Sequence, residues 1–339
     1  MNLLAMETRN LGRTGLKVSQ LCLGCMMFGD VTPEAESLAI IQAALDAGIN
    51  FLDTADKYGA GASERVVGKA LQGRRDAVVL ATKVGLQVDG SGPNASGTSR
   101  KHIREALEAS LKRLGTDYVD LYYLHTRDAG TPLEESLAAL DDLVRAGKVL
   151  YVGVSNFRAW QVTRSFGLQE SHGWDRLAAV QPLYNLANRD AEVELLPACS
   201  ALGIGVCSYS PLARGVLTGK YQPGQKPPPE SRAGRGNVRL MQTEYREANF
   251  ALAEEIGKLA AQVGCTAAQL ALAWVMANRL VTAPLLGPRT MAQLEDNLGA
   301  LQVALTPEVE AAIDALVPPG EHSGKGYQDP GFPVTGRVR

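Results

Sequence analysis

The chain has 339 residues, of which 45% are hydrophobic and 21% are charged, and its formal net charge is −2. This length is normal for one α/β barrel with insertions. The near-zero charge argues against a surface for nucleic acid or another polyanion. The apolar start is too short for a signal peptide, and no run approaches the roughly 18 apolar residues of a membrane span. We therefore expect one domain over residues 1–339 in a cytoplasmic protein without a membrane partner.

Short apolar runs rich in β-branched residues alternate with longer stretches of helical period along the chain. Eight of these runs are predicted strands, at residues 20–25, 50–54, 77–83, 119–125, 149–155, 179–181, 205–208 and 282–287. The predicted helices span residues 33–47, 63–71, 99–114, 132–146, 158–170, 190–202, 245–263 with 266–277, and 290–300. Eight strands with eight crossovers favour a closed (β/α)8 TIM barrel, although a doubly wound open sheet fits the same alternation.

Three segments fall outside this alternation. The loops at 85–98 and 213–243 are long for a compact domain, and such loops are usually functional or disordered. The barrel core is expected over about 11–316, and the tail at 317–339 is rich in proline and glycine. We predict an irregular C-terminal tail that either covers the active-site mouth or extends away from it.

The five cysteines are odd in number and lie mostly in apolar stretches. This usage predicts reduced, buried thiols and no disulfide framework. Cys22 and Cys25 form a C-x-x-C pair, but no second pair or nearby histidine completes a zinc site. We predict no metal.

Ionisable residues stand at the ends of three successive predicted strands. Asp53, Lys83 and His125 each close an apolar run. In a barrel the carboxyl ends of the strands meet on one face, so these side chains are expected to lie close together. Each residue alone has an ordinary structural explanation, but burial of an unpaired charge costs several kcal/mol, and pairing Asp53 with Lys83 removes that cost.

Tyr58 follows the second predicted strand, where Gly59 and Gly61 permit a tight turn. An unperturbed tyrosine pKa of about 10 is too high for acid-base work at neutral pH. An ammonium about 4 Å from the phenol oxygen contributes on the order of 4 kcal/mol at an effective dielectric near 20, which lowers that pKa by up to about 3 before burial opposes it. Beside Lys83, Tyr58 is a candidate proton donor.

A glycine-rich stretch at residues 90–95 formally satisfies the G-x-G-x-x-A dinucleotide fingerprint. The loop that contains it continues through Pro93 to about Thr98 before the next helix begins, so a pyrophosphate would lose the helix terminus that normally holds it. We interpret the stretch as a chance match.

Five motifs carry a resemblance to a known family. They are D-T-A-D-K-Y-G at 53–59, A-T-K at 81–83, L-K-R-L-G-T-D-Y-V-D-L-Y-Y-L-H at 111–125, G-V-S-N-F at 153–157 and Y-S-P-L-A-R-G-V-L-T-G-K-Y at 209–221. Together they resemble the aldo-keto reductases, bacterial-type NADPH-dependent oxidoreductases that share a barrel with potassium-channel β subunits. The matches run in family order from Leu11 to about Leu305.

The resemblance implies four catalytic roles. Tyr58 is the general acid, Lys83 depresses the pKa of Tyr58, Asp53 pairs with Lys83, and His125 orients the substrate carbonyl. The implied reaction is reversible reduction of an aldehyde or ketone. Because no side chain supplies a hydride, a nicotinamide cofactor is required.

The resemblance also implies the cofactor-binding residues. Ser155, Asn156 and Gln181, with Asp53 nearby, would hold the carboxamide, and Tyr209 would stack on the nicotinamide. A loop over the pyrophosphate would be formed by Ser210, Pro211, Leu212, Ala213, Gly215 and Lys220, with Arg232 as a strap. Gly24 would let the backbone approach the ring. The last segment comprises Gly287, Arg289, Thr290, Gln293, Asp296 and Asn297.

The segment around Arg289 favours NADPH over NADH. The end of a strand followed directly by a helix is suited to bind a phosphate. Arg289 can form a bidentate pair with a 2′-phosphate, and no carboxylate beside it favours the unphosphorylated ribose. Asp296 departs from the glutamate more usual in the family, which puts the adenine contact in doubt.

Two other classes of function compete with the reductase. A cofactor-binding redox sensor or channel-associated subunit would share the barrel, but all four catalytic residues are present, which favours turnover. A barrel isomerase or lyase for sugars would need metal ligands or another phosphate pattern. Substrate choice is expected to depend on Met26, Met27, the 85–98 loop, residues 157–160 and the tail.

Overall fold

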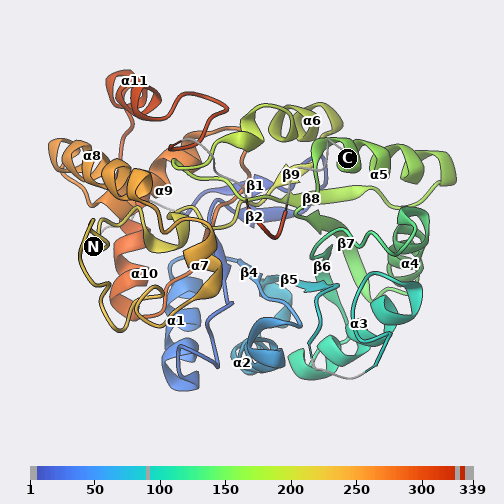
Figure 1. The fold of residues 1–339 in the computed structure, drawn as a ribbon. Coiled ribbons are helices and arrows are strands. Elements are labelled where there is room, and N and C mark those ends of the chain that lie inside the picture. Colours follow the sequence, from blue (N-terminus) through green and yellow to red (C-terminus); the bar gives the residue numbers. More distant parts are fainter. Residues whose placement is uncertain (1–5, 89–91, 325–328, 333–339) are drawn as a thin grey trace.

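Eight parallel strands form one sheet in the computed structural model, which describes residues 6–88, 92–324 and 329–332 (Figure 1). Their order is β10-β3-β4-β5-β6-β7-β8-β9. Their bounds are β3 (Cys22–Gly24), β4 (Phe51–Asp53), β5 (Val79–Val84), β6 (Val119–Leu124), β7 (Val149–Ser155), β8 (Leu177–Gln181), β9 (Gly205–Val206) and β10 (Leu285–Leu286). Each predicted strand overlaps one of these.

Hydrogen bonds between the two ends of the sheet close it. The Thr282 amide donates to the Val206 carbonyl at 2.8 Å, and the Leu285 amide donates to the Ser208 carbonyl at 2.8 Å. An open doubly wound sheet has unpaired edges at these positions. The predicted (β/α)8 TIM barrel is therefore confirmed.

Helices surround the barrel (Figure 1). They are α1 (Glu34–Asp46), α2 (Ala62–Ala70), α3 (Arg100–Leu114), α4 (Leu133–Arg145), α5 (Ala159–His172), α6 (Leu195–Leu202), α7 (Val238–Gln242), α8 (Glu247–Val263), α9 (Ala267–Ala277), α10 (Met291–Leu298) and α11 (Pro307–Leu316). In the described part of the chain no single helix is long and apolar enough to cross a membrane. Only α8 and α9 taken together reach that length and composition, and they meet at a bend of 88°.

Alternating strand residues build two separate cores, as the period of two requires. Phe51, Leu121 and Tyr123 fill the barrel interior, whereas Leu52 and Tyr122 pack outward against the helices.

The C-x-x-C thiols divide in the same way between the two cores. Cys22 belongs to the interior and Cys25 to the outer core. Burial raises the pKa of both thiols, which suits inert core residues.

Four features differ from the sequence prediction. An antiparallel hairpin, β1 (Thr8–Asn10) with β2 (Lys17–Ser19), was not expected. It lies near the amino ends of the strands, where the Arg13 amide donates to the Gly203 carbonyl at 2.8 Å. Helices α7 and α11 were also unexpected, and the helix predicted at 190–202 begins at Leu195. A start at 190 would place Pro197 in the helix interior, whereas in the first turn its missing N–H is not needed.

Part of the sequence interpretation falls outside the described residues. These are 1–5, 89–91 in the 85–98 loop with part of the G-x-G-x-x-A stretch, and 325–328 and 333–339 in the tail. Helix α3 begins at Arg100 with Ser99 as its N-cap, so the glycine-rich stretch does not open a helix.

Arg189 joins α11 to the barrel and is almost completely buried. Its guanidinium donates to Glu192, to Asp314 at 2.6 Å and to the Val317 carbonyl at 2.7 Å. We expect Arg189→Leu to lower the free energy of unfolding by about 3 kcal/mol, because the partly buried Glu192 carboxylate loses its counter-charge.

Urea unfolding measures this effect. Arg176→Leu is the matched control, since the Arg176–Glu170 pair is exposed and such pairs contribute about 1 kcal/mol or less. Equal destabilisation by the two substitutions would contradict the role given to Arg189.

Candidate active site

A cavity of about 800 Å³ opens at the carboxyl ends of the strands. All but three of the residues predicted for the site lie in its wall. Those in the wall are Gly24, Asp53, Tyr58, His125, Ser155, Asn156, Gln181, Tyr209, Ser210, Pro211, Leu212, Gly215, Lys220, Arg232, Gly287, Arg289, Gln293, Asp296 and Asn297. Of the other three, Lys83 and Ala213 are fully buried beneath the surface, and Thr290 caps α10.

The cavity floor holds a buried ion pair between Lys83 at the end of β5 and Asp53 at the end of β4. The Lys83 ammonium donates to the Asp53 carboxylate, to the Thr54 carbonyl at 2.8 Å and to the Tyr58 phenol oxygen at 3.2 Å. Gln181 donates to the second Asp53 oxygen at 2.8 Å. Despite burial, the Asp53 carboxylate raises the pKa of Lys83. Lys83 therefore stays protonated beside Tyr58.

Burial decides the pKa of Tyr58. It raises the pKa above the ordinary tyrosine value, while the Lys83 charge pulls it down. The lowering expected from the lysine is present but is outweighed in this closed environment. Tyr58 therefore keeps its proton at neutral pH.

His125 stands next to Tyr58, with ring centroids 5.7 Å apart and ring planes at 86°. Burial, followed by the Lys83 charge, holds the pKa of His125 well below its usual value. Nδ1 makes no hydrogen bond to any described residue. A neutral imidazole thus faces the phenol across the cavity floor.

Backbone strain concentrates around the cavity. The non-glycine residues with positive φ in the described chain are Ala60 in the Tyr58 loop, Asn156 after β7, and Ser210, Ala213 and Arg214 after β9. Such conformations cost about 1–3 kcal/mol each and persist where the surroundings hold them, often at functional sites.

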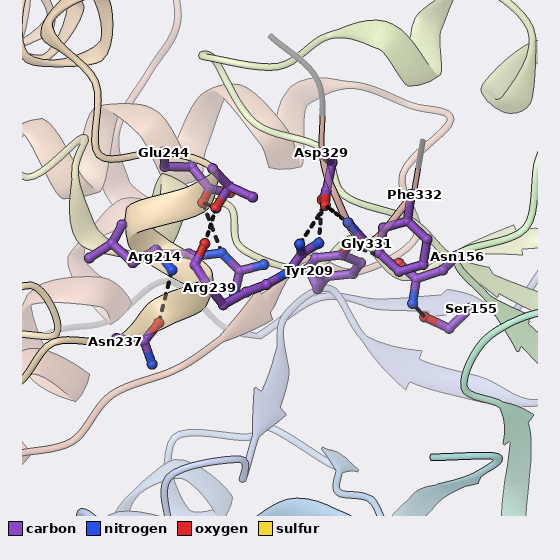
Figure 2. Close-up of polar contacts among 12 residues, drawn as sticks. Ser155, Asn156, Tyr209, Arg214, Asn237, Arg239, Glu244, Asp329, Gly331 and Phe332 are labelled. Atoms are coloured by element: carbon purple, nitrogen blue, oxygen red, sulfur yellow. Dashed lines mark hydrogen bonds and ion pairs between the residues drawn. The ribbon is translucent and has the colours of Figure 1, made fainter. Parts of the chain in front are cut away.

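Asn156 is the centre of a polar network in the wall (Figure 2). Its amide donates to the His125 carbonyl at 2.9 Å and to the Ser155 hydroxyl at 3.1 Å, and it accepts from the Tyr209 hydroxyl at 2.8 Å. The network ties β6, β7 and the segment after β9 together. It fixes the Tyr209 ring at the edge of the cavity.

The far end of the cavity is cationic. Among the described residues, no carboxylate lies within ion-pair distance of Lys220, Arg232 or Arg289. Burial and the neighbouring arginines lower the pKa of Lys220 to about 8 and that of Arg232 to about 10. Cations that repel one another in a partly closed site form a receptor for an anion.

Three glycines shape this cavity. A Cβ at Gly24 would lie 2.8 Å from the Leu286 carbonyl, so close packing of β3 on β10 explains this glycine. A Cβ at Gly215 would lie 2.6 Å from the Lys220 ammonium, whereas Gly287 faces open space. Gly215 and Gly287 thus leave room for a ligand.

Asp296 already accepts hydrogen bonds within the protein. Its carboxylate accepts from Thr266 and Gln269, each at 3.0 Å. This residue therefore ties α10 to α9 as well as lining the cavity.

Several wall residues escaped the sequence reasoning. These are chiefly Arg214 and Arg239, and Ala268 and Leu272 of α9; Gly331 and Phe332 were not named singly, but they belong to the tail that was expected to affect substrate choice. Arg214 lies within the matched 209–221 motif and could have been found there. The others come from a long loop, a helix and the tail, whose placement depends on packing.

Asp56 is a further buried carboxyl close to the site. Neither of its oxygens has a hydrogen-bond partner of ordinary geometry among the described residues. Burial and the Glu64 carboxylate raise the pKa of Asp56 to about 7, while the Lys57 amide and the charges of Arg113 and Lys83 oppose that rise.

Asp56 is expected to make stability depend on pH. Because its folded-state pKa exceeds the unfolded value, the folded protein binds this proton more tightly, and stability falls as pH rises from about 4 to 7. Relative to wild type, Asp56→Asn is therefore expected to gain about 2 kcal/mol between pH 5 and pH 8. Urea unfolding at the two pH values tests this, and an unchanged difference would contradict it.

The fold and the site define the class: an α/β-barrel protein whose cavity at the carboxyl ends of the strands has a polar floor of Asp53, Tyr58, Lys83 and His125 and a cationic far end. The sequence model of the aldo/keto reductase family matches residues 20–318, so the chain belongs to that family.

Named relatives agree with this assignment. The chain is 41% identical to "Uncharacterized oxidoreductase YrpG" of Bacillus subtilis, covering 95% of this chain and 99% of that protein. It is 40% identical to "Probable voltage-gated potassium channel subunit beta" of Oryza sativa, covering 92% and 97%. It is 34% identical to "Versiconal hemiacetal acetate reductase" of Aspergillus parasiticus, covering 94% and 100%. The family and the reductase relatives support an oxidoreductase.

Proposed function

We propose that this protein is a cytoplasmic aldo-keto reductase that uses NADPH to reduce an aldehyde or ketone reversibly to the alcohol. The observation that carries the proposal is the 3.2 Å contact from the Lys83 ammonium to the Tyr58 phenol oxygen on the cavity floor. A protonated phenol, an ammonium behind it and a neutral imidazole beside it form a proton-donating group for a carbonyl oxygen.

The chain's own residues fit the cofactor. Ser155, Asn156 and Gln181 offer polar groups for the carboxamide, and Tyr209 offers a flat aromatic face. The cations at the other end suit the phosphates. When bound, NADPH supplies the hydride that no side chain can provide.

Tyr58 would give its proton to the oxygen of the substrate carbonyl. Lys83 stabilises the phenolate that remains, because its ammonium already points at the phenol oxygen. The Asp53 carboxylate holds that ammonium in place. A neutral His125 donates a second hydrogen bond and orients the carbonyl. In alcohol oxidation the same groups would act in the opposite direction, with the Tyr58 oxygen accepting the hydroxyl proton.

Arg289 is expected to set the preference for NADPH. Its guanidinium lines the cavity and donates to the Glu230 carbonyl at 3.0 Å, which leaves donors for a phosphate. Arg289→Ala is expected to weaken NADPH binding about 30-fold and to leave NADH binding within about twofold. The exposed Arg279→Ala is the control of equal charge. Parallel losses for both nucleotides would contradict the assignment.

The proposal as a whole is tested by titrating the protein with NADPH and NADH while following intrinsic fluorescence, and then adding aldehydes and ketones. Tight NADPH binding with turnover supports the reductase. The relatives named as channel β subunits make a regulatory cofactor-binding subunit the second candidate. NADPH binding without turnover on any carbonyl favours that candidate, and binding of neither nucleotide contradicts both.

A further inference from the structure

The described tail residues 329–332 lie at the cavity mouth beside Tyr209 and Asn156 (Figure 2). Both Gly331 and Phe332 belong to the cavity wall. Arg158 donates to the Phe332 carbonyl at 3.0 Å, and the Gly331 amide donates to Asp329 at 2.8 Å. This part of the tail therefore covers the mouth, one of the two arrangements expected from the sequence.

Arg239 of α7 contacts this tail segment through Asp329 and Phe332. Its guanidinium forms a two-pronged ion pair with Asp329 and lies 5.4 Å from the centre of the Phe332 ring. Arg239 is 29% exposed and lines the cavity, whereas Asp329 is 10% exposed and is not part of the cavity wall. Asp329 thus takes up the charge of a cation that otherwise faces the ligand.

Charges are distributed unequally along the cavity. At the far end Lys220, Arg232 and Arg289 have no carboxylate partner among the described residues. At the other end, here called the carbonyl end and marked by Tyr58, His125 and Tyr209, the described cations are paired, Lys83 with Asp53 and Arg239 with Asp329. His125 is neutral there.

The remaining lining at the carbonyl end is apolar, with Met26, Met27, Leu86 and Phe332 in the wall. Among the described wall residues at this end, a substrate carboxylate would find no unpaired cation, because Asp329 already takes up the Arg239 charge. The uncharged apolar part of a substrate would lose little solvation free energy on entering this end of the cavity.

We propose that Asp329 is a specificity-determining residue: by pairing with Arg239 it makes the carbonyl end uncharged and selects uncharged carbonyl substrates with an apolar or aromatic body over carboxylate-bearing ones. This inference rests on the proposed reductase function and deepens it. When Asp329 carries no charge, the Arg239 guanidinium is free to form a bidentate pair with a substrate carboxylate.

The test compares two aldehydes of similar shape, methyl 4-formylbenzoate and 4-carboxybenzaldehyde. Wild type is expected to favour the uncharged ester in kcat/KM by about tenfold or more. Asp329→Asn, which retains an acceptor for the Gly331 amide, is expected to shift the ratio of the two substrates toward the carboxylate by about tenfold. Adding Arg239→Gln to Asp329→Asn is expected to abolish that shift.

Glu310→Gln makes the same charge change on an exposed face of α11 and is the matched control, with no shift expected. An unchanged ratio in Asp329→Asn, a shift that survives Arg239→Gln, or an equal shift in Glu310→Gln would each overturn the proposal. A merely structural role for Asp329 would change both substrates alike and leave the ratio constant.

Failure of the reductase function itself is recognised separately, as turnover of neither aldehyde by any variant. In that case benzoate and benzamide are titrated against the NADP⁺-saturated proteins by fluorescence. Benzoate is expected to bind Asp329→Asn about tenfold more tightly than wild type, with benzamide unchanged. Equal benzoate affinity in the two proteins would overturn the inference.

Discussion

Tyr58→Phe is expected to lower kcat for carbonyl reduction by about 10³-fold while NADPH binding stays within about twofold of wild type. In the proposed mechanism the phenol is the proton donor; it lies on the cavity floor beside His125, with the Lys83 ammonium pointing at its oxygen. Phenylalanine keeps the ring and its packing but carries no proton to give. Single-turnover absorbance of NADPH measures the effect without interference from product release.

The cofactor titration is the control for this variant. If binding is retained and turnover falls, the loss lies in the chemical step. Turnover within about tenfold of wild type would contradict the role of Tyr58 and would point to water or His125 as the proton source.

Lys83→Met is expected to lower the free energy of unfolding by about 3–5 kcal/mol and to abolish turnover. The side chains of Lys83 and Asp53 are 0% and 1% exposed, so the substitution leaves a buried carboxylate without its counter-charge. The phenolate of Tyr58 also loses the ammonium that would stabilise it. Urea unfolding and carbonyl reduction measure the two effects separately.

The matched variant is Asp53→Asn combined with Lys83→Met. Removal of both charges of a buried pair is often nearly neutral for stability, so the double variant is expected to recover most of the lost unfolding free energy but none of the activity. A double variant as unstable as Lys83→Met would contradict the pairing argument.

The position of three members of the proposed catalytic group could be predicted from the sequence because each stands at the end of a strand, whereas Tyr58 lies on the loop after β4. Asp53, Lys83 and His125 each close an apolar run, and the parallel sheet brings those ends to one face. The closed barrel was favoured by the alternation of eight strands with eight crossovers. The hydrogen bonds that close it, from the Thr282 and Leu285 amides to Val206 and Ser208, could not be predicted because they depend on the packed fold.

The balance of forces at Tyr58 could not be read from the sequence. Proximity to Lys83 was expected, but the extent of burial decides the direction of the pKa and arises only from the packed fold. The raised pKa of Asp56 could not be predicted either, because the motif that contains this residue does not reveal that its carboxyl lacks hydrogen-bond partners.

The tail shows the limit of reasoning from local pattern. Its proline and glycine content predicted irregular structure, but nothing in the sequence connects Asp329 with Arg239, which are 90 positions apart. Such a pair forms because the fold brings the 213–243 loop and the tail to the same rim. In our proposal, substrate selection depends on this pair.

The central claim is that hydride passes from NADPH to a carbonyl carbon while Tyr58 supplies the proton. It is tested most directly by reduction of an aldehyde with NADPH deuterated at one or the other C4 position of the nicotinamide, followed by NMR of the alcohol. Because Tyr209 covers one side of the proposed ring site, we expect deuterium at the carbinol carbon from only one of the two cofactors. Alcohol without deuterium from either cofactor would contradict the account.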